Sequence, residues 1–388
     1  MPDLVLGVLL LAAAGGAWWL LGDLRPLPRA AAATSSVAGD ARSVSVVVPA
    51  RDEQDTLPLL LEAVRRLAVG VREVVVVDDG SRDATAAVAR ATGAVVVPAG
   101  APPPGWTGKA WACHVGARAA GGDRLLFLDA DTVLARDALT ALLELHAEHG
   151  GLVSVQPYHA VERPYEQLSA YFNVVALMAS SAFTRAAGGR ALAFGPCLLT
   201  SRADYERAGG HAAVRGEILD DAQLAAAYRR AGLPVRCATG GASVRMRSYP
   251  GGLRQLVAGW TKNVASGAST AAPGAMLGTV LWVCAHHAIA VGAVLAAVAG
   301  LSGHGTALSH GSAALWAVAW VLAAAQLRVI LRRTGSFRWW TWAVFPVPLV
   351  AFDVIFVMSA VQTAVRRSVR WRGRDVDLHG RGSAEGRA

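Results

Sequence analysis

Two aspartates one position apart, Asp129 and Asp131, follow an apolar run from Leu125 to Leu128. A buried strand that ends in two carboxylates offers hard oxygen ligands of the kind that Mg²⁺ or Mn²⁺ prefers, and such an ion can bind a diphosphate. Aspartate is also common where a strand ends or a helix is capped, so the pair alone fits a structural role equally well. The positions of other acidic residues are needed to distinguish a metal site from a cap.

A second apolar run, Val74 to Val77, leads directly into Asp78 and Asp79. All-apolar strands are typical of parallel sheets that are covered on both faces. In open α/β sheets, ligands bind at the carboxyl ends of the strands. Two acidic strand ends at the same edge of a sheet therefore favour a ligand site.

Strand and helix patterns alternate from about residue 43 to residue 247, as a βαβ domain requires. Predicted strands cover residues 44–48, 74–77, 94–97, 125–128 and 152–156, and predicted helices cover residues 56–67, 83–92, 136–149 and 222–230. Residues 166–184 form a further apolar helix with little charge. It fits either an interfacial helix that walls an acceptor groove or a buried core helix.

The composition indicates a membrane protein, because 54% of the 388 residues are hydrophobic and only 17% are charged. No Asp, Glu, Lys or Arg occurs from Asn263 to Leu327, which is long enough for two crossings of about 20 residues each. We place these crossings at residues 276–301 and 306–330, joined by a polar loop that contains His304. Further apolar segments cover residues 4–21 and 339–365.

The sequence thus predicts an N-terminal anchor within residues 1–24 and about three helices within residues 263–365, followed by a basic tail at 366–388. A signal peptide is the alternative for the first segment, but the positive residues that precede such a peptide's apolar core are missing. Arg25, Arg29 and Arg42 follow the anchor, so the positive-inside rule places the globular domain in the cytoplasm of a multi-pass inner-membrane protein. The side of the tail stays open, because Pro346 and Pro348 would allow a re-entrant last segment.

The net charge of +9 is explained by arginines beside the apolar segments, which anionic lipid headgroups attract. Nucleic acid is not an expected partner, because no basic stripe carries interleaved aromatic residues. The four cysteines are scattered and have neither zinc-site nor redox-pair spacing.

Several further motifs carry a family resemblance. They are Pro49-Ala50-Arg51-Asp52-Glu53, Gly105-Trp106-Thr107-Gly108-Lys109, Phe194-Gly195-Pro196-Cys197, Ala208-Gly209-Gly210-His211, Leu219-Asp220-Asp221-Ala222-Gln223-Leu224-Ala225 and Gly259-Trp260-Thr261-Lys262-Asn263. With the acidic strand ends, they make the sequence resemble the family-2 glycosyltransferases, which have the GT-A fold. The nearest branch is similar to enzymes that glycosylate carotenoids, such as the 4,4'-diaponeurosporenoate glycosyltransferases, or that are associated with hopanoid pathways. The resemblance implies an α/β nucleotide-sugar-binding domain over residues 43–262.

The resemblance also implies roles for single residues on the donor side. Donor-binding positions are Pro49, Ala50 and Glu53 beside the base and ribose, Asp78 at the nucleoside, Asp129 at the metal, and Lys109, Trp260 and Lys262. Asp129 and Asp131 match the metal-binding pair, with Asp131 as the more direct ligand and Mg²⁺ or Mn²⁺ as the cofactor. Lys109 fits a diphosphate contact or a solvated lysine. Trp260 and Lys262 fit either closure over the donor or an interfacial position at the entrance to a membrane span.

Asp221 is the expected catalytic base, because the family has an acidic pair here whose second member takes the proton from the acceptor. The family usually has Glu before this Asp, and Asp220 is a conservative departure. A helix N-cap is the structural alternative for this pair. A base opposite the leaving group implies one displacement with inversion.

Polymer-forming members of the superfamily carry Gln-x-x-Arg-Trp after the acidic pair, and here only Trp260 is kept. This absence favours transfer of a single sugar, expected from a UDP-sugar, to a membrane lipid such as a carotenoid or a hopanoid. Transfer to a polyprenyl phosphate and a non-catalytic protein that binds nucleotide-sugar or lipid remain as alternatives.

His286, His287 and Asp353 lie inside predicted apolar segments, where ionisable groups are often functional. His286 and His287 are adjacent, so they cannot face one direction on a helix and are unsuited to a shared metal site. Asp353 is expected to pair with a basic group.

Overall fold

The computed structural model describes residues 2–28, 40, 43–185, 193–217, 219–267, 272–302, 312–366, 368–371 and 374–377. The chain forms two compact units. The α/β unit comprises Leu24–Ala160 and Gly188–Ser248, and the helical unit comprises Met1–Asp23, Val161–Ala187 and Tyr249–Ala388. The segment that was predicted to be an interfacial helix therefore groups with the apolar helices.

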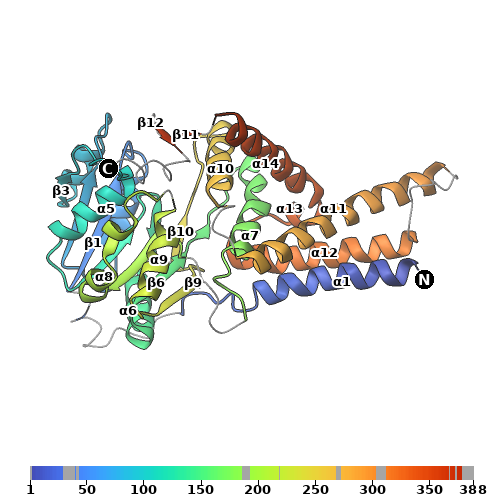
Figure 1. The fold of residues 1–388 in the computed structure, drawn as a ribbon, viewed down its shortest axis with the longest axis horizontal. Helices are drawn as coiled ribbons and strands as arrows, with labels where there is room; N and C mark the ends of the chain where they lie inside the picture. Colours follow the sequence, from blue (N-terminus) through green and yellow to red (C-terminus); the bar gives the residue numbers. More distant parts are fainter. Residues whose placement is uncertain are drawn as a thin grey trace, which may run out of the picture. The chain divides into compact units, whose positions relative to one another are not determined.

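A seven-stranded mixed sheet forms the centre of the α/β unit, in the order β3-β2-β1-β4-β8-β6-β9 (Figure 1). Its strands are β1 Val44–Ala50, β2 Glu73–Asp78, β3 Val95–Pro98, β4 Arg124–Leu128, β6 Leu152–Gln156, β8 Cys197–Ser201 and β9 Val235–Thr239. The first four in the order β3-β2-β1-β4 run parallel, and β8 is antiparallel to both of its neighbours. A second sheet has the order β5-β10-β7, with β5 Thr132–Leu134, β7 Tyr158–His159 and β10 Val244–Met246.

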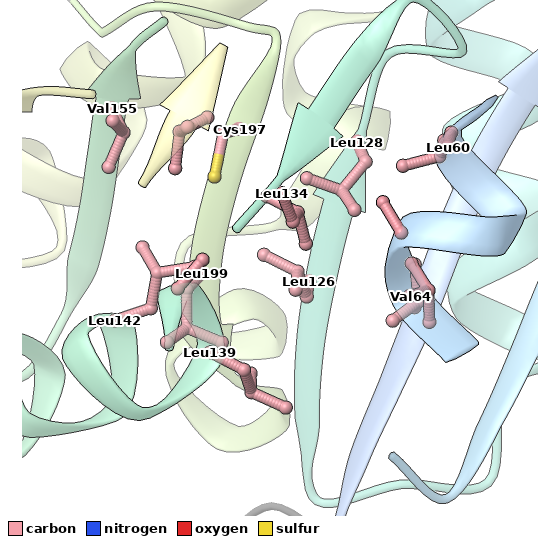
Figure 2. Close-up of a cluster of buried hydrophobic side chains, with 14 of the residues drawn as sticks. Leu60, Val64, Leu126, Leu128, Leu134, Leu139, Leu142, Val155, Cys197 and Leu199 are labelled. Atoms are coloured by element: carbon pink, nitrogen blue, oxygen red, sulfur yellow. The ribbon is translucent and has the colours of Figure 1, made fainter. Parts of the chain in front are cut away.

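Both faces of the large sheet are covered, which explains why its central strands are buried and mostly apolar. Successive side chains alternate between the faces. In β4, Leu126 and Leu128 belong to one buried cluster, whereas Leu125 and Phe127 belong to the other. Figure 2 shows the first cluster, in which Leu126 and Leu128 lie among side chains of two helices and of β8.

The helices of this unit are α3 Leu57–Arg65, α4 Thr85–Ala91, α5 Gly108–Ala119, α6 Ala138–His149, α8 Arg202–Arg207 and α9 Asp220–Arg230, with a 3₁₀ turn η2 at Gly210–Val214. Leu60 of α3 and Leu139 of α6 help to form the first cluster, and Cys113 of α5 and Leu224 of α9 the second. The parallel register places Ala50 opposite Asp78 and Val47 opposite Phe127. The carboxyl ends of β1, β2 and β4 consequently meet at one edge, as the sequence predicts.

The helical unit contains α1 Pro2–Leu20, η1 Pro164–Ser169, α7 Ala170–Ala179, α10 Leu253–Gly267, α11 Pro273–Ser302, α12 Ala313–Thr334, α13 Trp339–Ala343 and α14 Pro346–Arg366, with a hairpin of β11 Ser368–Trp371 and β12 Arg374–Asp377. Helices α1, α11 and α12 pack side by side (Figure 1). Among the described residues, Pro273–Leu301 and Ala313–Thr334 are long and apolar enough to cross a membrane. Leu4–Leu20 and Pro346–Gln362 are shorter apolar stretches.

Polar and small residues hold these three helices together. Trp282 Nε1 donates to Gln326 Oε1 (2.9 Å), and Gln326 Nε2 donates to the carbonyl of Ala14 (2.9 Å), so one amide links all three. Gly292 of α11 faces the ring of Trp316, and a Cβ at Gly292 would lie 2.4 Å from that ring. Small residues and interhelical hydrogen bonds are typical of helix packing in membranes.

The structure bears on two of the alternatives left open for these segments. The rings of Tyr171 and Phe172 in α7 are buried, which favours the core-helix interpretation of residues 166–184. Pro346 and Pro348 lie in the first turn of α14, where proline is well tolerated, so this helix runs on without a break to Arg366. The loop with His304 lies outside the described residues.

Candidate active site

The loops that follow β1 and β2 are joined by reciprocal hydrogen bonds. Asp52 Oδ1 accepts from the Arg82 amide (2.7 Å), and the Glu53 amide donates to Thr85 Oγ1 (2.8 Å). Asp52 has a φ of 53°, a left-handed conformation that is uncommon for a residue with a side chain. The two loops therefore act as one rigid rim at the strand ends.

Within this rim the acids divide into two groups. Asp79 accepts from Arg51 Nη1 at its carbonyl (3.1 Å) and its carboxylate (3.4 Å), and Asp83 Oδ2 accepts from the Gln54 amide (3.1 Å). Both therefore form hydrogen bonds that hold the two loops together. Asp78 ends β2, where its Oδ1 accepts from the Ser81 amide (3.1 Å). It lies beside Ala50 across the register, and Pro49 and Ala50 close β1.

Asp129 and Asp131 lie in the turn between β4 and β5, next to Lys109 in the first turn of α5. Lys109 Nζ is 2.7 Å from Asp129 Oδ1, so this lysine is paired, although 41% of its side chain is exposed to solvent. Burial of the ammonium acts to lower the pKa of Lys109, but the carboxylates of Asp129 and Asp220 outweigh it and hold this pKa well above its ordinary value. Lys109 is therefore a fixed positive charge in an acidic site.

Negative charge is crowded around the carboxyl group of Asp131. Burial and the negative charges of Asp129 and Glu53 raise the pKa of Asp131 to about 7. Crowded carboxylates of this kind are relieved by a divalent cation, and an all-oxygen ligand set fits Mg²⁺ or Mn²⁺. Among the described residues no cluster of three or more His, Cys, Asp or Glu side chains forms a complete metal cage. A two-carboxylate half-site is what Mg²⁺ commonly uses when substrate phosphates supply the other ligands.

Asp220 and Asp221 begin helix α9. Asp221 Oδ2 accepts from the Gly195 amide and its Oδ1 accepts from the Ala222 amide, each at 2.8 Å. Burial raises the pKa of Asp221. For the buried carboxyl of Asp220, burial outweighs the opposing charge of Lys109 and raises the pKa to about 6. Leu219 is the N-cap residue of α9, so neither acid has the cap role. The two amides orient the Asp221 carboxylate without consuming all of its lone pairs, which is compatible with the base role.

Gly195 connects the two halves of the site. A Cβ at this position would lie 3.2 Å from Lys109 Nζ and 3.3 Å from Asp221 Oδ2. The metal-side lysine and the expected base therefore border the same small volume. Gly195 has no role that its sequence motif alone predicts, although the Gly-Pro pair just before β8 was the available signal.

Trp260 and Lys262 belong to α10 in the helical unit. The Trp260 indole donates to Ser169 Oγ (2.9 Å), and its ring stacks on Phe172 with centroids 4.7 Å apart. This hydrogen bond and this ring contact hold the Trp260 side chain within the helical unit. Its expected contact with the donor stays a prediction, as does that of Lys262.

Comparison with known proteins identifies the family. A model described as glycosyl transferase family 2 matches residues 45–177. The 4,4'-diaponeurosporenoate glycosyltransferase of Staphylococcus aureus (strain MRSA252) is 34% identical over 343 residues, which are 87% of this chain and 89% of that protein. The chain belongs to glycosyl transferase family 2. It is therefore a glycosyltransferase, as the motifs predicted.

Two further comparisons describe this family-2 enzyme's relatives. The 4,4'-diaponeurosporenoate glycosyltransferase of Staphylococcus haemolyticus (strain JCSC1435) is 38% identical over 249 residues, which are 62% of this chain and 66% of that protein. The mannosyltransferase PcManGT from Pyrobaculum calidifontis, solved in complex with GDP-Man and Mn²⁺, is 20% identical, with a TM-score of 0.53. It covers 92% of this chain and 99% of its own. This likeness confirms a GT-A-like α/β fold.

Proposed function

We propose that this glycosyltransferase transfers a single sugar from a nucleoside-diphosphate sugar, expected to be a UDP-sugar, to a lipid acceptor in the membrane. One observation carries the proposal. Lys109, paired with Asp129 of the expected metal site, and Asp221, the expected base, border one volume beside Gly195. A sugar in that volume would have its leaving diphosphate on the Lys109 side and its incoming acceptor on the Asp221 side.

On the donor side, Pro49, Ala50, Glu53 and Asp78 would hold the nucleoside at the joined loops. Asp129 and Asp131 would hold Mg²⁺ or Mn²⁺, which, when bound, supplies Lewis-acid stabilisation of the departing diphosphate. Lys109 adds a positive charge that stays ionised over the whole working pH range, because its pKa is raised. The fixed charge is oriented before the reaction begins, which is how preorganised sites stabilise developing charge.

On the acceptor side, Asp221 would take the proton of an attacking hydroxyl. The amides of Gly195 and Ala222 fix its carboxylate, and its raised pKa brings it nearer to the operating pH, where a general base is most effective. Attack from the face opposite the leaving group gives inversion in one displacement, with no covalent enzyme intermediate.

We infer a carotenoid-like acceptor from the names of the relatives, both of which are glycosyltransferases of 4,4'-diaponeurosporenoate. A hopanoid is the second acceptor to test. We further propose that α1, α11, α12 and α14 all cross the membrane, with the α/β unit in the cytoplasm. Exposed apolar side chains on all four helices support this, and α14 with its 21 residues is about 30 Å long.

The test is incubation of membranes containing the protein with radiolabelled nucleotide-sugars and either a polyene carboxylic acid or a hydroxylated polyene. We expect label in one glycolipid, lost with EDTA and restored by Mg²⁺ or Mn²⁺. The Asp131→Asn variant in matched membranes should show at most about one hundredth of the activity. Label in long polysaccharide would overturn single transfer, and an acid-labile sugar phosphate would identify a polyprenyl-phosphate acceptor instead.

A further inference from the structure

A polar pair joins two apolar helices of the helical unit. His287 Nε2 of α11 lies 2.7 Å from Asp353 Oδ2 of α14, and both side chains are 40% exposed. The neighbouring His286 is buried instead, and its Nδ1 contacts the Trp282 carbonyl at 2.9 Å. The two histidines thus face different surroundings, as adjacent positions on a helix must. Asp353 has the basic partner that the sequence led us to expect.

The contacts of His287 fix the number of protons in this pair. Its Nδ1 lies 2.9 Å from the Val283 carbonyl, which can only accept, so Nδ1 carries a hydrogen. Its Nε2 faces a carboxyl oxygen at 2.7 Å, and this contact also requires one hydrogen between the two atoms. The pair is therefore either imidazolium with carboxylate or imidazole with carboxylic acid. Both forms have zero net charge, which makes the pair tolerable in hydrocarbon.

The surface around the pair is apolar. The exposed large side chains nearest in sequence on the two helices are all apolar: Val280, Leu281, Val291, Val294, Val350, Val354, Phe356 and Val357. If α11 and α14 cross the membrane, these residues contact lipid, and the half-exposed pair contacts it too. A polar group at such a position is a functional candidate, because an exposed hydrogen-bonding group in hydrocarbon is costly unless something binds it.

One atom of the pair remains open to a ligand. No described residue donates a hydrogen bond to Asp353 Oδ1. This oxygen is an acceptor in either protonation form, because the shared hydrogen lies on the Oδ2 side. A matching ligand must therefore donate a hydrogen from within the hydrocarbon. Hydroxyl and protonated carboxyl groups do so, whereas esters, ethers and fully ionised phosphates do not.

We propose that, in a binding step before sugar transfer at Asp221, the His287–Asp353 pair binds the hydrogen-bond-donating end group, a hydroxyl or protonated carboxyl, of a membrane lipid that serves as the acceptor. The identification of this lipid as the acceptor rests on the proposed function. The binding itself follows from the pair, its open oxygen and its apolar surroundings. A purely structural clamp between α11 and α14 is the alternative, and it would need neither the exposure nor the open oxygen.

The experiment uses the full chain in lipid nanodiscs and two probes, a long polyene alcohol and its methyl ether, which differ only in the donor hydrogen. Binding is followed by quenching of tryptophan fluorescence. We expect the wild-type protein to bind the alcohol about tenfold more tightly than the ether, as one hydrogen bond to a charged group allows. Asp353→Leu should reduce this ratio to about one, whereas Asp353→Asn should keep it. The Asn amide can donate to His287 Nε2 while its carbonyl oxygen still accepts.

A control variant separates binding from packing. Gln326→Leu removes a different interhelical polar contact, so it should lower the thermal midpoint and leave the alcohol-to-ether ratio unchanged. Equal wild-type affinity for the two probes would overturn the proposal, as would a preference that persists in Asp353→Leu. The wild-type comparison decides alone if that variant does not fold. Sugar transfer is measured separately: transfer without probe preference rejects only the lipid site, and preference without transfer rejects only the proposed function.

Discussion

Gly195 shows how a residue without a side chain can organise a catalytic site. Its amide donates to Asp221, and the space where a side chain would begin is bordered by Lys109 Nζ and Asp221 Oδ2. Both distances, 3.2 and 3.3 Å, are too short for an ordinary Cβ contact. A methyl group there must displace the lysine or the carboxylate.

We therefore expect Gly195→Ala to lower kcat for sugar transfer by about 10- to 100-fold, because small misplacements of reacting groups have effects of this size. Gly70→Ala is the matched control, since no atom lies within 4 Å of a Cβ there. Steady-state kinetics and the thermal midpoint of both variants give the comparison. A Gly195→Ala enzyme with unchanged kcat would show that this volume is not used by substrate.

The Asp221→Asn variant distinguishes the two acceptor chemistries. With a hydroxyl acceptor, loss of the base should lower kcat by about 10²- to 10⁴-fold. With a carboxylate acceptor the nucleophile is already ionised near neutral pH, so the variant should keep nearly full activity. Rates with a polyene alcohol and a polyene acid, measured on the same preparation, make the comparison. An Asp221→Asn variant that loses no more activity with the alcohol than with the acid would exclude Asp221 as the base.

His211 gives the α/β unit a pH-dependent stability. It is buried, its Nδ1 lies 2.8 Å from the Tyr205 hydroxyl, and burial lowers its pKa to about 3. The unfolded chain, with a histidine pKa near 6.5, binds a proton at a pH where the folded chain does not. Stability from this group is therefore complete above pH 6.5 and is lost as the pH falls.

Between pH 7 and pH 5 we expect the wild-type protein to lose about 2 kcal/mol of unfolding free energy through His211 alone. A His211→Gln variant, although less stable at pH 7, should lose about that much less over the same interval. Denaturant unfolding at the two pH values measures the difference. Parallel pH curves for the two proteins would show that His211 is not the group responsible.

The acidic residues of the site could be predicted from the sequence, but the contacts between the site residues could not. Asp129 and Asp131 stand out because they end an apolar strand. The Lys109–Asp129 pair joins residues 20 positions apart, and only the packing of α5 against the sheet brings them together. The role of Gly195 rests on its backbone amide and on the absence of a side chain, and the Gly-Pro motif marks this position without showing which residues it contacts.

At the level of elements, the apolar pattern predicted several strands of the sheet but missed a strand with which two of them pair. Strand β6 has the predicted limits, Leu152 to Gln156, because it is short, apolar and bounded by glycine and proline. Strand β8 was missed, although it is buried and pairs with β4 and β6. Its five residues include Cys, Thr and Ser, so no continuous β-branched run marks it. Helix α5 was also missed, since it begins at Gly108.

The contact between α11 and α12 gives a prediction for an element. Trp316 is buried against Gly292, where a Cβ would lie 2.4 Å from the ring. Gly292→Ala should destabilise the protein by about 1 to 3 kcal/mol, because overpacking forces the helices apart. Gly300→Ala in the same helix meets no atom within 4 Å and should have little effect. Thermal unfolding in detergent compares the two, and equal midpoints would contradict close packing at Gly292.

At the scale of the whole molecule, the two units present different surfaces. Among described residues, the large hydrophobic side chains that are exposed in the α/β unit are Leu59 and Val95. The helical unit exposes many more, along α1, α11, α12 and α14. This division is expected when one unit lies in water and the other in a bilayer.

If α11 and α12 cross the membrane from a cytoplasmic α/β unit, the end of α11 lies outside and the end of α12 lies inside. Single cysteines can test this in a Cys284→Ser background, because the other three cysteines are buried. In right-side-out vesicles, Leu301→Cys should react with a membrane-impermeant maleimide, whereas Arg333→Cys should react only after permeabilisation. Arg332 and Arg333 end α12, so the positive-inside rule requires this order. The opposite labelling pattern would show that the protein has the inverted orientation in the membrane. Labelling of both sites from outside would mean that α12 does not cross.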